Sequence, residues 1–176
     1  SDPYVHEGLI SLKDSGLIKS CGTSVYSFEE LDYTIESGIY DYIQVPINIL
    51  DTSYYRRIIS YDSEIKIVAR SLFLQGILFQ NKSIEKEVKY SKALKNCLDN
   101  ALNLCKSHSV SLDTACISYV NSLDQIDHII IGTDSLDNLN SNLISMDFKL
   151  EDRLLQSINE ISSNHKPWTN PRNWSS

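Results

Sequence analysis

The chain has 176 residues, of which 41% are hydrophobic and 22% are charged, so it is long enough to bury one core as a single domain or part of one. It has no apolar run near the roughly 20 residues that a membrane span needs, and no charged-then-apolar leader. A net charge of −7, without a basic cluster larger than the pair Arg56-Arg57, excludes the electrostatic pattern of nucleic-acid-binding proteins. We therefore expect a globular cytoplasmic protein.

Short β-prone apolar runs alternate along the chain with longer segments of helical period. In chain order, the pattern first predicts a helix over 6–18, a strand over 20–26, a helix over 27–38, a strand over 41–48, a helix over 53–60 and a strand over 64–72. Two helices over 84–107 and 112–123 and a strand over 127–131 follow. The chain then has a helix carrying Leu136, Leu139 and Leu143, and a terminal helix carrying Leu150, Leu154, Ile158 and Ile161.

The start and end of the helix over 27–38 have their own signals. Ser27 can accept a hydrogen bond from the amide of Glu30 while the Glu30 side chain reaches back, the reciprocal arrangement of a capping box. Gly38 stands where a C-terminal stop is expected. The spacing predicts a buried stripe of Phe28, Leu31, Ile35 and Ile39.

Strands that are apolar throughout, separated by helices, predict an α/β fold with a parallel sheet. No linker or repeat interrupts the chain, so we expect one domain, with strand-helix units over 1–145 and a terminal helix and tail over 146–176. Four such units are half of the eight, in about 250 residues, that form a (β/α)8 barrel. A doubly wound sheet is the alternative, but Cys21-Gly22-Thr23-Ser24 is not its glycine-rich turn.

Four motifs each end a predicted strand. They are Cys21-Gly22-Thr23-Ser24-Val25-Tyr26-Ser27, Gln44-Val45-Pro46-Ile47-Asn48, Ala69-Arg70-Ser71-Leu72-Phe73-Leu74-Gln75-Gly76 and Ile130-Ile131-Gly132-Thr133. In this order and spacing the chain resembles the C-terminal half of an aldo/keto reductase, in the form of a bacterial branch of that family. The resemblance implies a TIM barrel that binds a nicotinamide dinucleotide across its C-terminal face and reduces a carbonyl by hydride transfer.

In the family that this chain resembles, the catalytic Asp, Tyr, Lys and His belong to the first half of the barrel. We therefore assign no catalytic residue in this chain. Ser1-Asp2-Pro3 resembles the stretch after the family's fourth strand, and the only Met is Met146. These features predict that an N-terminal half is missing, that this fragment alone is inactive, and that it self-associates through open strand edges.

The resemblance also implies which residues hold the nicotinamide. Ser24 and Gln44 match positions that bind its carboxamide, and Val25 replaces a family Asn beside them. An unpaired amide in the strand of Gln44 would cost about 1–3 kcal/mol, so Gln44 needs a partner. Arg70 replaces an aromatic residue that stacks on the nicotinamide in many members; a salt bridge is the alternative role.

The remaining cofactor positions form two groups. Ser71, Leu72 and Leu74 match a pyrophosphate loop that offers main-chain donors, and Gly132, Thr133, Asn138 and Asn142 match positions at the adenosine end. The helix that follows Gly132 has free N-terminal amides that suit a phosphate. The acids Asp134 and Asp137 lie in this segment, with no Lys or Arg for a 2′-phosphate. We therefore expect NADH rather than NADPH.

The remaining polar residues predict no metal site. The cysteines, Cys21, Cys97, Cys105 and Cys116, lack zinc-site spacing, and the histidines are scattered. Reduced core thiols are the expected state. Two other functions stay open: a non-catalytic interaction or sensor domain on the same fold, and a phosphate-binding aldolase or isomerase barrel. The second leaves Ser24 and Gln44 unexplained.

Overall fold

A computed structural model of the chain describes residues 3–79, 91–166 and 169. Its elements are α1 (Pro3–Asp14), β1 (Gly22–Ser24), α2 (Phe28–Glu36), β2 (Tyr42–Pro46), α3 (Ser53–Ile58), β3 (Lys66–Arg70), the 3₁₀ helix η1 (Leu74–Phe79), α5 (Ser91–Ser107), α6 (Leu112–Asn121), β4 (Ile126–Ile129), α7 (Leu136–Asp147) and α8 (Asp152–Ser162). Each predicted strand and helix has a counterpart, while the predicted helical residues 84–90 and both Trp residues of the tail lie outside the described residues.

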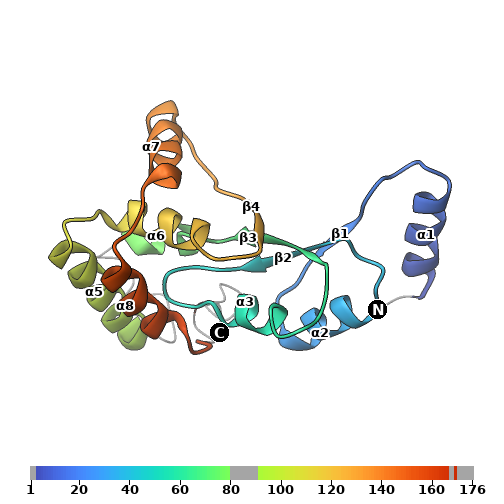
Figure 1. Ribbon diagram of the computed structural model, residues 1–176, viewed down its shortest axis with the longest axis horizontal. Helices are drawn as coiled ribbons and strands as arrows, with labels where there is room; N and C mark the ends of the chain where they lie inside the picture. Colours follow the sequence, from blue (N-terminus) through green and yellow to red (C-terminus); the bar gives the residue numbers. More distant parts are fainter. Residues whose placement is uncertain (1–2, 80–90, 167–168, 170–176) are drawn as a thin grey trace.

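The strands form one parallel sheet in the order β1-β2-β3-β4 (Figure 1). Ser24 pairs in register with Gln44, and Pro46 pairs with Arg70. Because parallel strands end at one edge of a sheet, the turns after all of them gather at that edge. The sheet therefore brings the predicted cofactor residues to one side of the molecule.

The two faces of the sheet differ in burial. Ile43 and Val45 on β2 and Ala69 on β3 are fully buried against the helices, whereas Gln44 and Arg70 point to the other face and are half-buried. The alternation follows the two-residue period of a strand. This second face is the surface that a closed barrel would enclose.

The predicted capping box of α2 is confirmed, with one difference. Ser27 Oγ accepts from the Glu30 amide at 3.1 Å, while Glu30 Oε2 accepts from the amide of Tyr26, one residue before the cap, at 2.6 Å. Gly38 ends the helix in the left-handed region, at φ +64°. The turn between β1 and α2 is therefore fixed by its own side chains.

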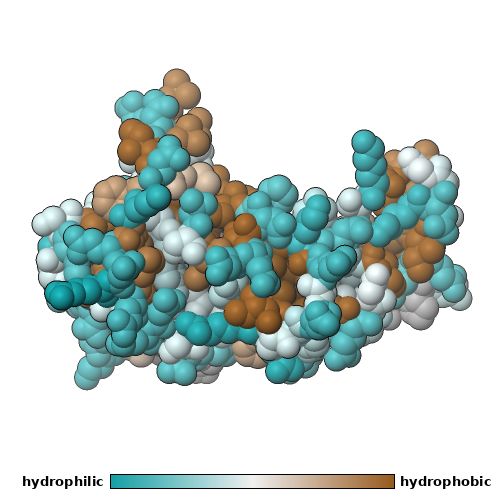
Figure 2. Space-filling view, in the orientation of Figure 1, coloured by the Kyte–Doolittle hydropathy of each residue, from teal (hydrophilic) through white to brown (hydrophobic). Residues whose placement is uncertain are grey.

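Apolar faces of α1 and α7 remain exposed at opposite ends of the molecule (Figures 1 and 2). On α7, Leu136 is 77% exposed and Ile144 is 72% exposed; Leu12 in α1 and Leu17 after it are also exposed. The period of the sequence identified the helices, but not whether a neighbour covers them.

The segment after α8 is bound to the loop between β2 and α3. Asp51 in this loop is only 4% exposed. Its Oδ2 accepts from the Lys166 amide and from Thr169 Oγ1, both at 2.9 Å, and its Oδ1 accepts from the Ser53 amide at 2.9 Å. His165 Nδ1 lies 3.2 Å from the same carboxylate. Asp51 therefore joins residues more than a hundred positions apart.

The same loop is held in place by the side chain of Asn48. Its Oδ1 accepts from the amides of Leu50 and Asp51 at 2.9 and 3.0 Å. Tyr54 and Tyr55, which follow in α3, are buried. This buried loop directly follows the strand that carries Gln44.

The described cysteines are all free; Cys105 and Cys116 are buried, whereas Cys21 and Cys97 are half-buried rather than core residues. Burial raises the pKa of the Cys105 thiol to about 11, so this thiol stays protonated at neutral pH. No His, Cys, Asp and Glu group suited to a metal ion occurs within the described ranges. Among these same residues, no helix is long and apolar enough to cross a membrane.

Gly22 tolerates no side chain, because β1 and β2 approach closely there. A Cβ on Gly22 would lie 2.8 Å from Tyr42 Cβ and 2.9 Å from the Tyr42 carbonyl oxygen. We expect Gly22→Ala to lower the free energy of unfolding by about 1–3 kcal/mol, measured by urea denaturation. Gly8→Ala is the control, since a Cβ there meets no atom within 4 Å in α1, and we expect it to be neutral or stabilising. Equal effects of the two substitutions would contradict this account.

Candidate cofactor-binding site

An amide and a hydroxyl meet where β1 and β2 end. Ser24 Oγ donates to Gln44 Oε1 at 2.8 Å, so the partner that Gln44 needs is Ser24. Ser24 is exposed and Gln44 half-buried, so the pair is accessible from the open face of the sheet. It can present a donor and an acceptor together, which is what a primary carboxamide requires.

Val25 is not part of this polar pair. It is 2% exposed and points into the core, and its amide donates to the Gln44 carbonyl at 3.1 Å. Its backbone carbonyl remains at the surface of the site and accepts from Arg70 Nη2 at 3.0 Å. Val25 thus contributes main chain rather than a side chain.

Arg70 extends from the end of β3 to the turn after β1. Its Cζ lies 4.2 Å from the centre of the Tyr26 ring, and Nη1 donates to Ser71 Oγ at 3.2 Å. Its contacts therefore hold it within the site.

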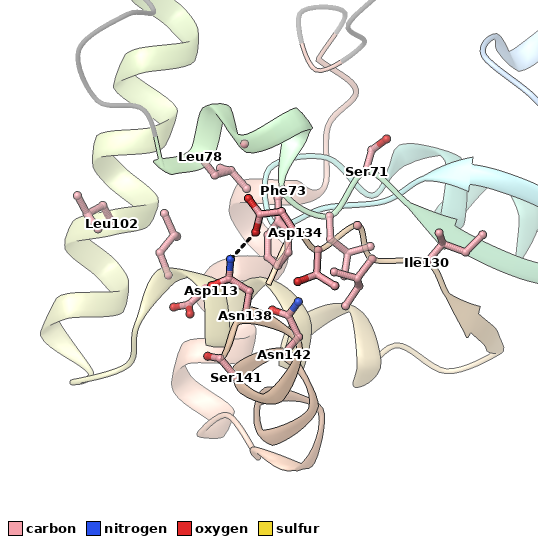
Figure 3. A pocket seen from close by; sticks show the side chains of 16 residues that line it. Ser71, Phe73, Leu78, Leu102, Asp113, Ile130, Asp134, Asn138, Ser141 and Asn142 are labelled. Atoms are coloured by element: carbon pink, nitrogen blue, oxygen red, sulfur yellow. Dashed lines mark hydrogen bonds between the residues drawn. The ribbon is translucent and has the colours of Figure 1, made fainter. Parts of the chain in front are cut away.

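A cleft of about 970 Å³ opens between the turn after β3 and the turn after β4 (Figure 3). It contains six of the predicted cofactor residues: Ser71, Leu72, Gly132, Thr133, Asn138 and Asn142. A Cβ added to Gly132 or Gly76 would meet no atom within 4 Å, which indicates open space beside the backbone on both sides of the cleft. The structure thus brings together two segments that are about 60 residues apart in sequence.

The turn after β3 has an unusual backbone. Ser71 has φ +62° and Leu74 has φ +47°, both in the left-handed region that non-glycine residues rarely adopt. Such conformations cost about 1–3 kcal/mol each and are concentrated at binding sites. This turn is therefore held in place by the structure around it rather than by local preference.

Leu74 differs from the prediction. It is fully buried, does not line the cleft, and donates its amide to the Ser71 carbonyl at 3.0 Å. The amide is used to close the turn and is not a donor for a ligand. The side chain of Leu74 instead packs in the hydrophobic core.

The turn after β4 leads into α7 at the mouth of the cleft. Ser135 caps the helix by accepting from the Asn138 amide at 3.1 Å, and Thr133 Oγ1 donates to the Ser135 carbonyl at 3.1 Å. Asn138 Nδ2 donates to Asp134 Oδ1 at 2.8 Å, the contact drawn in Figure 3. The first turn of α7 thus presents backbone amides, an amide side chain and a carboxylate to the cleft.

Some lining residues were missed by the sequence analysis. They come from α5 and α6: Leu102, Leu112 and Asp113. A signal for Asp113 did exist, because it follows the predicted break before 112 and lies in the first turn of α6. Helices that return from a parallel sheet begin at its carboxyl edge, which is where the site lies. Leu102 has no such signal, since it lies in the middle of α5.

The cleft is acidic. Asp113 and Asp134 line it, and no Lys or Arg belongs to its described lining. An acidic residue in such a site can accept hydrogen bonds from ribose hydroxyls, whereas a 2′-phosphate needs a cation. The described lining of the cleft therefore has two acidic side chains and no basic one.

Comparisons with known proteins give one family match. The model of the aldo/keto reductase family matches residues 4–163, while no curated protein sequence matches. Among solved structures, the holo form of the aldo-keto reductase AKR11C1 from Bacillus halodurans aligns with a TM-score of 0.74 at 19% identity, over 99% of this chain and 60% of that one. Its apo form aligns with a TM-score of 0.74 at 19% identity, over 99% and 62%.

A mutant of Gox0644 in complex with NADPH aligns with a TM-score of 0.60 at 18% identity, over 94% of this chain and 56% of that one. The present chain thus spans about 60% of the length of the structures that it resembles. The predicted α/β fold is confirmed: four parallel strands with helices, arranged as in a large part of a TIM barrel.

Proposed function

Because the chain belongs to the aldo/keto reductase family, we propose that it forms the cofactor-binding part of an NAD(P)H-dependent oxidoreductase that reduces a carbonyl. The observation that carries this proposal is the cleft between the turns after β3 and β4, which lies at the same edge of the parallel sheet as the Ser24–Gln44 pair. When bound, a reduced nicotinamide supplies a hydride to the carbonyl carbon.

The residues present fit a dinucleotide. The cleft volume of about 970 Å³ lies at the upper end of the range usual for ligand pockets. We propose that the Ser71–Leu72 turn and the first turn of α7 hold the pyrophosphate and the adenosine, with Gly132, Thr133, Asn138 and Asn142 around them. Ser24 and Gln44 hold the carboxamide, which fixes the face of the nicotinamide ring.

The proton for the reduced carbonyl has to come from outside this chain. We assign no catalytic acid here, since the family's Asp, Tyr, Lys and His belong to the other half of the barrel. The proposal is therefore that this chain binds the cofactor and, alone, does not turn over a carbonyl substrate.

Another set of parallel strands would complete the site. β1 and β4 are the outer strands of the described sheet, and apolar side chains of α1 and α7 are exposed. Exposed edges and apolar patches of this kind mark surfaces that are covered in the functional protein. We propose that the N-terminal half of an eight-stranded barrel covers them, and that the isolated chain self-associates.

NADH is the form of cofactor that we expect to bind. Asp113 and Asp134 oppose the charge of a 2′-phosphate, so we expect the dissociation constant of NADPH to exceed that of NADH by about tenfold or more. Titration of the chain with each dinucleotide, followed by the fluorescence of the dihydronicotinamide, measures both constants. Asp134→Asn should reduce the difference, while Asp62→Asn, on an exposed loop before β3, should leave it unchanged. Tighter binding of NADPH would contradict the assignment of NADH, and binding of neither would overturn the proposed function.

A further inference from the structure

Tyr54 connects the segments that follow β1 and β2. Its Oη donates to the backbone carbonyl of Tyr26 at 2.7 Å, across 28 positions of the sequence. Tyr26 comes two residues after Ser24, while Tyr54 lies in the first turn of α3, the next helix after the strand of Gln44. One side-chain hydrogen bond thus joins the two segments that carry the Ser24–Gln44 pair.

The Tyr54 hydroxyl remains a donor at neutral pH. Tyr54 is only 5% exposed. Burial, reinforced by the negative charge of Asp51, raises the pKa of Tyr54 to about 12. Because the phenol keeps its proton well above neutral pH, Oη can donate to the Tyr26 carbonyl throughout the neutral range.

Aromatic packing fixes the direction of this hydroxyl. The centre of the Tyr54 ring lies 4.9 Å from that of Phe28 and 6.0 Å from that of His165. The rings of Phe28 and His165 are themselves 4.9 Å apart. Phe28 begins α2, and His165 belongs to the segment after α8. The Tyr54 ring is therefore held by two other parts of the chain, in addition to the hydrogen bond that it makes.

The turn that Tyr54 contacts carries Ser24 at its start. β1 has only three residues, and Ser24 at its end is exposed. Single bonds tie the backbone after it: the Val25 amide donates to the Gln44 carbonyl at 3.1 Å, and the Tyr26 amide donates to Glu30 Oε2 at 2.6 Å. A shift of this turn would change the place of the Ser24 hydroxyl, and a binding group displaced by about 1 Å loses much of its effect.

We propose that Tyr54 is a positioning residue for the nicotinamide: by holding the Tyr26 backbone, it sets the place of the Ser24 hydroxyl beside Gln44. This inference rests on the proposed function, since it assumes that the carboxamide binds at Ser24 and Gln44. Tyr54 acts only through the turn. Its effect is therefore confined to the part of the ligand that contacts the Ser24–Gln44 pair, and does not extend to the adenosine or the pyrophosphate.

Tyr54→Phe tests this role, because it removes one oxygen atom and keeps the packing of the ring. Titration calorimetry of the native chain and of the variant gives the dissociation constants of NADH and of ADP-ribose, which has no nicotinamide. We expect the constant for NADH to rise about fivefold, the effect of one hydrogen bond, and that for ADP-ribose to stay unchanged. In a chain that already carries Gln44→Leu, Tyr54→Phe should cause no further loss, since the pair that it positions is gone.

Tyr119→Phe is the matched control for general stability. Tyr119 is also buried, and its Oη donates to Asn159 Oδ1 at 2.7 Å, between α6 and α8. This substitution should lower the free energy of unfolding about as much as Tyr54→Phe does, and should leave the binding of both ligands unchanged.

The outcomes separate this inference from the proposed function. If NADH binds to Tyr54→Phe as tightly as to the native chain, or if NADH and ADP-ribose lose affinity equally, the role of Tyr54 is overturned while the proposed function stands. If neither ligand binds the native chain, the proposed function fails and this inference fails with it.

Discussion

Replacement of Gln44 by leucine is expected to weaken the binding of NADH by about 10- to 100-fold. The leucine removes the acceptor of the Ser24 hydroxyl and the donor for the carboxamide oxygen of the ligand, while the volume of the side chain is nearly kept. A carboxamide placed against leucine leaves polar groups without partners, which costs about 1–3 kcal/mol. Titration calorimetry of the variant with NADH measures the loss.

The control for this variant is a ligand rather than a second mutation. ADP-ribose has the adenosine, the pyrophosphate and the second ribose of NADH, but no nicotinamide. It should bind to Gln44→Leu as tightly as to the native chain, because the cleft between the turns after β3 and β4 is unchanged. An equal loss for both ligands would show that Gln44 supports the fold of the site and does not contact the carboxamide.

Replacement of Asp51 by alanine is expected to lower the free energy of unfolding by about 3–5 kcal/mol. Asp51 is buried and accepts from Ser53, Lys166 and Thr169, with the His165 ring 3.2 Å away. Removal of one side of a buried charged network leaves its other members without partners, and this is one of the more costly single changes in a protein. Urea denaturation monitored by circular dichroism gives the value.

Asp32→Ala is the matched control for this prediction. Asp32 also accepts three hydrogen bonds, from Arg57 Nε, Arg57 Nη2 and Tyr61 Oη, at 2.8 to 3.0 Å. Its ion pair lies at the surface, with the Arg57 side chain 49% exposed, and surface ion pairs contribute about 1 kcal/mol or less. If the two variants lost the same stability, the buried network around Asp51 would have no special role in holding the end of the chain.

The elements with strong local signals could be predicted from the sequence. The capping box at Ser27 and the stop at Gly38 define α2 because a few neighbouring residues determine both ends. The terminal helix was also predicted from its apolar residues, of which Leu154 and Ile158 are buried in the core. Strand order followed from the alternation of strands and helices, as parallel neighbours joined by helices usually lie side by side.

Contacts between distant segments could not be predicted in this way. No local pattern shows that Asp51 binds residues beyond α8, or that Arg70 reaches the Tyr26 ring. Leu74 was assigned to the cleft from its place in a motif, but the left-handed backbone of the turn directs it into the core. The exposed face of α7 has the same origin, since amphipathic period predicts an apolar face and not the neighbour that covers it.

The measurement that most directly tests the central claim is hydrogen–deuterium exchange of the chain with and without saturating NADH. The account predicts slower exchange of backbone amides in two groups of segments, at 22–26 and 42–48 around Ser24 and Gln44 and at 70–78 and 130–142 around the cleft. ADP-ribose should protect only the second group. Binding of NADH without protection of either group, or with protection confined to other segments, would contradict the proposal that this edge of the sheet holds the dinucleotide.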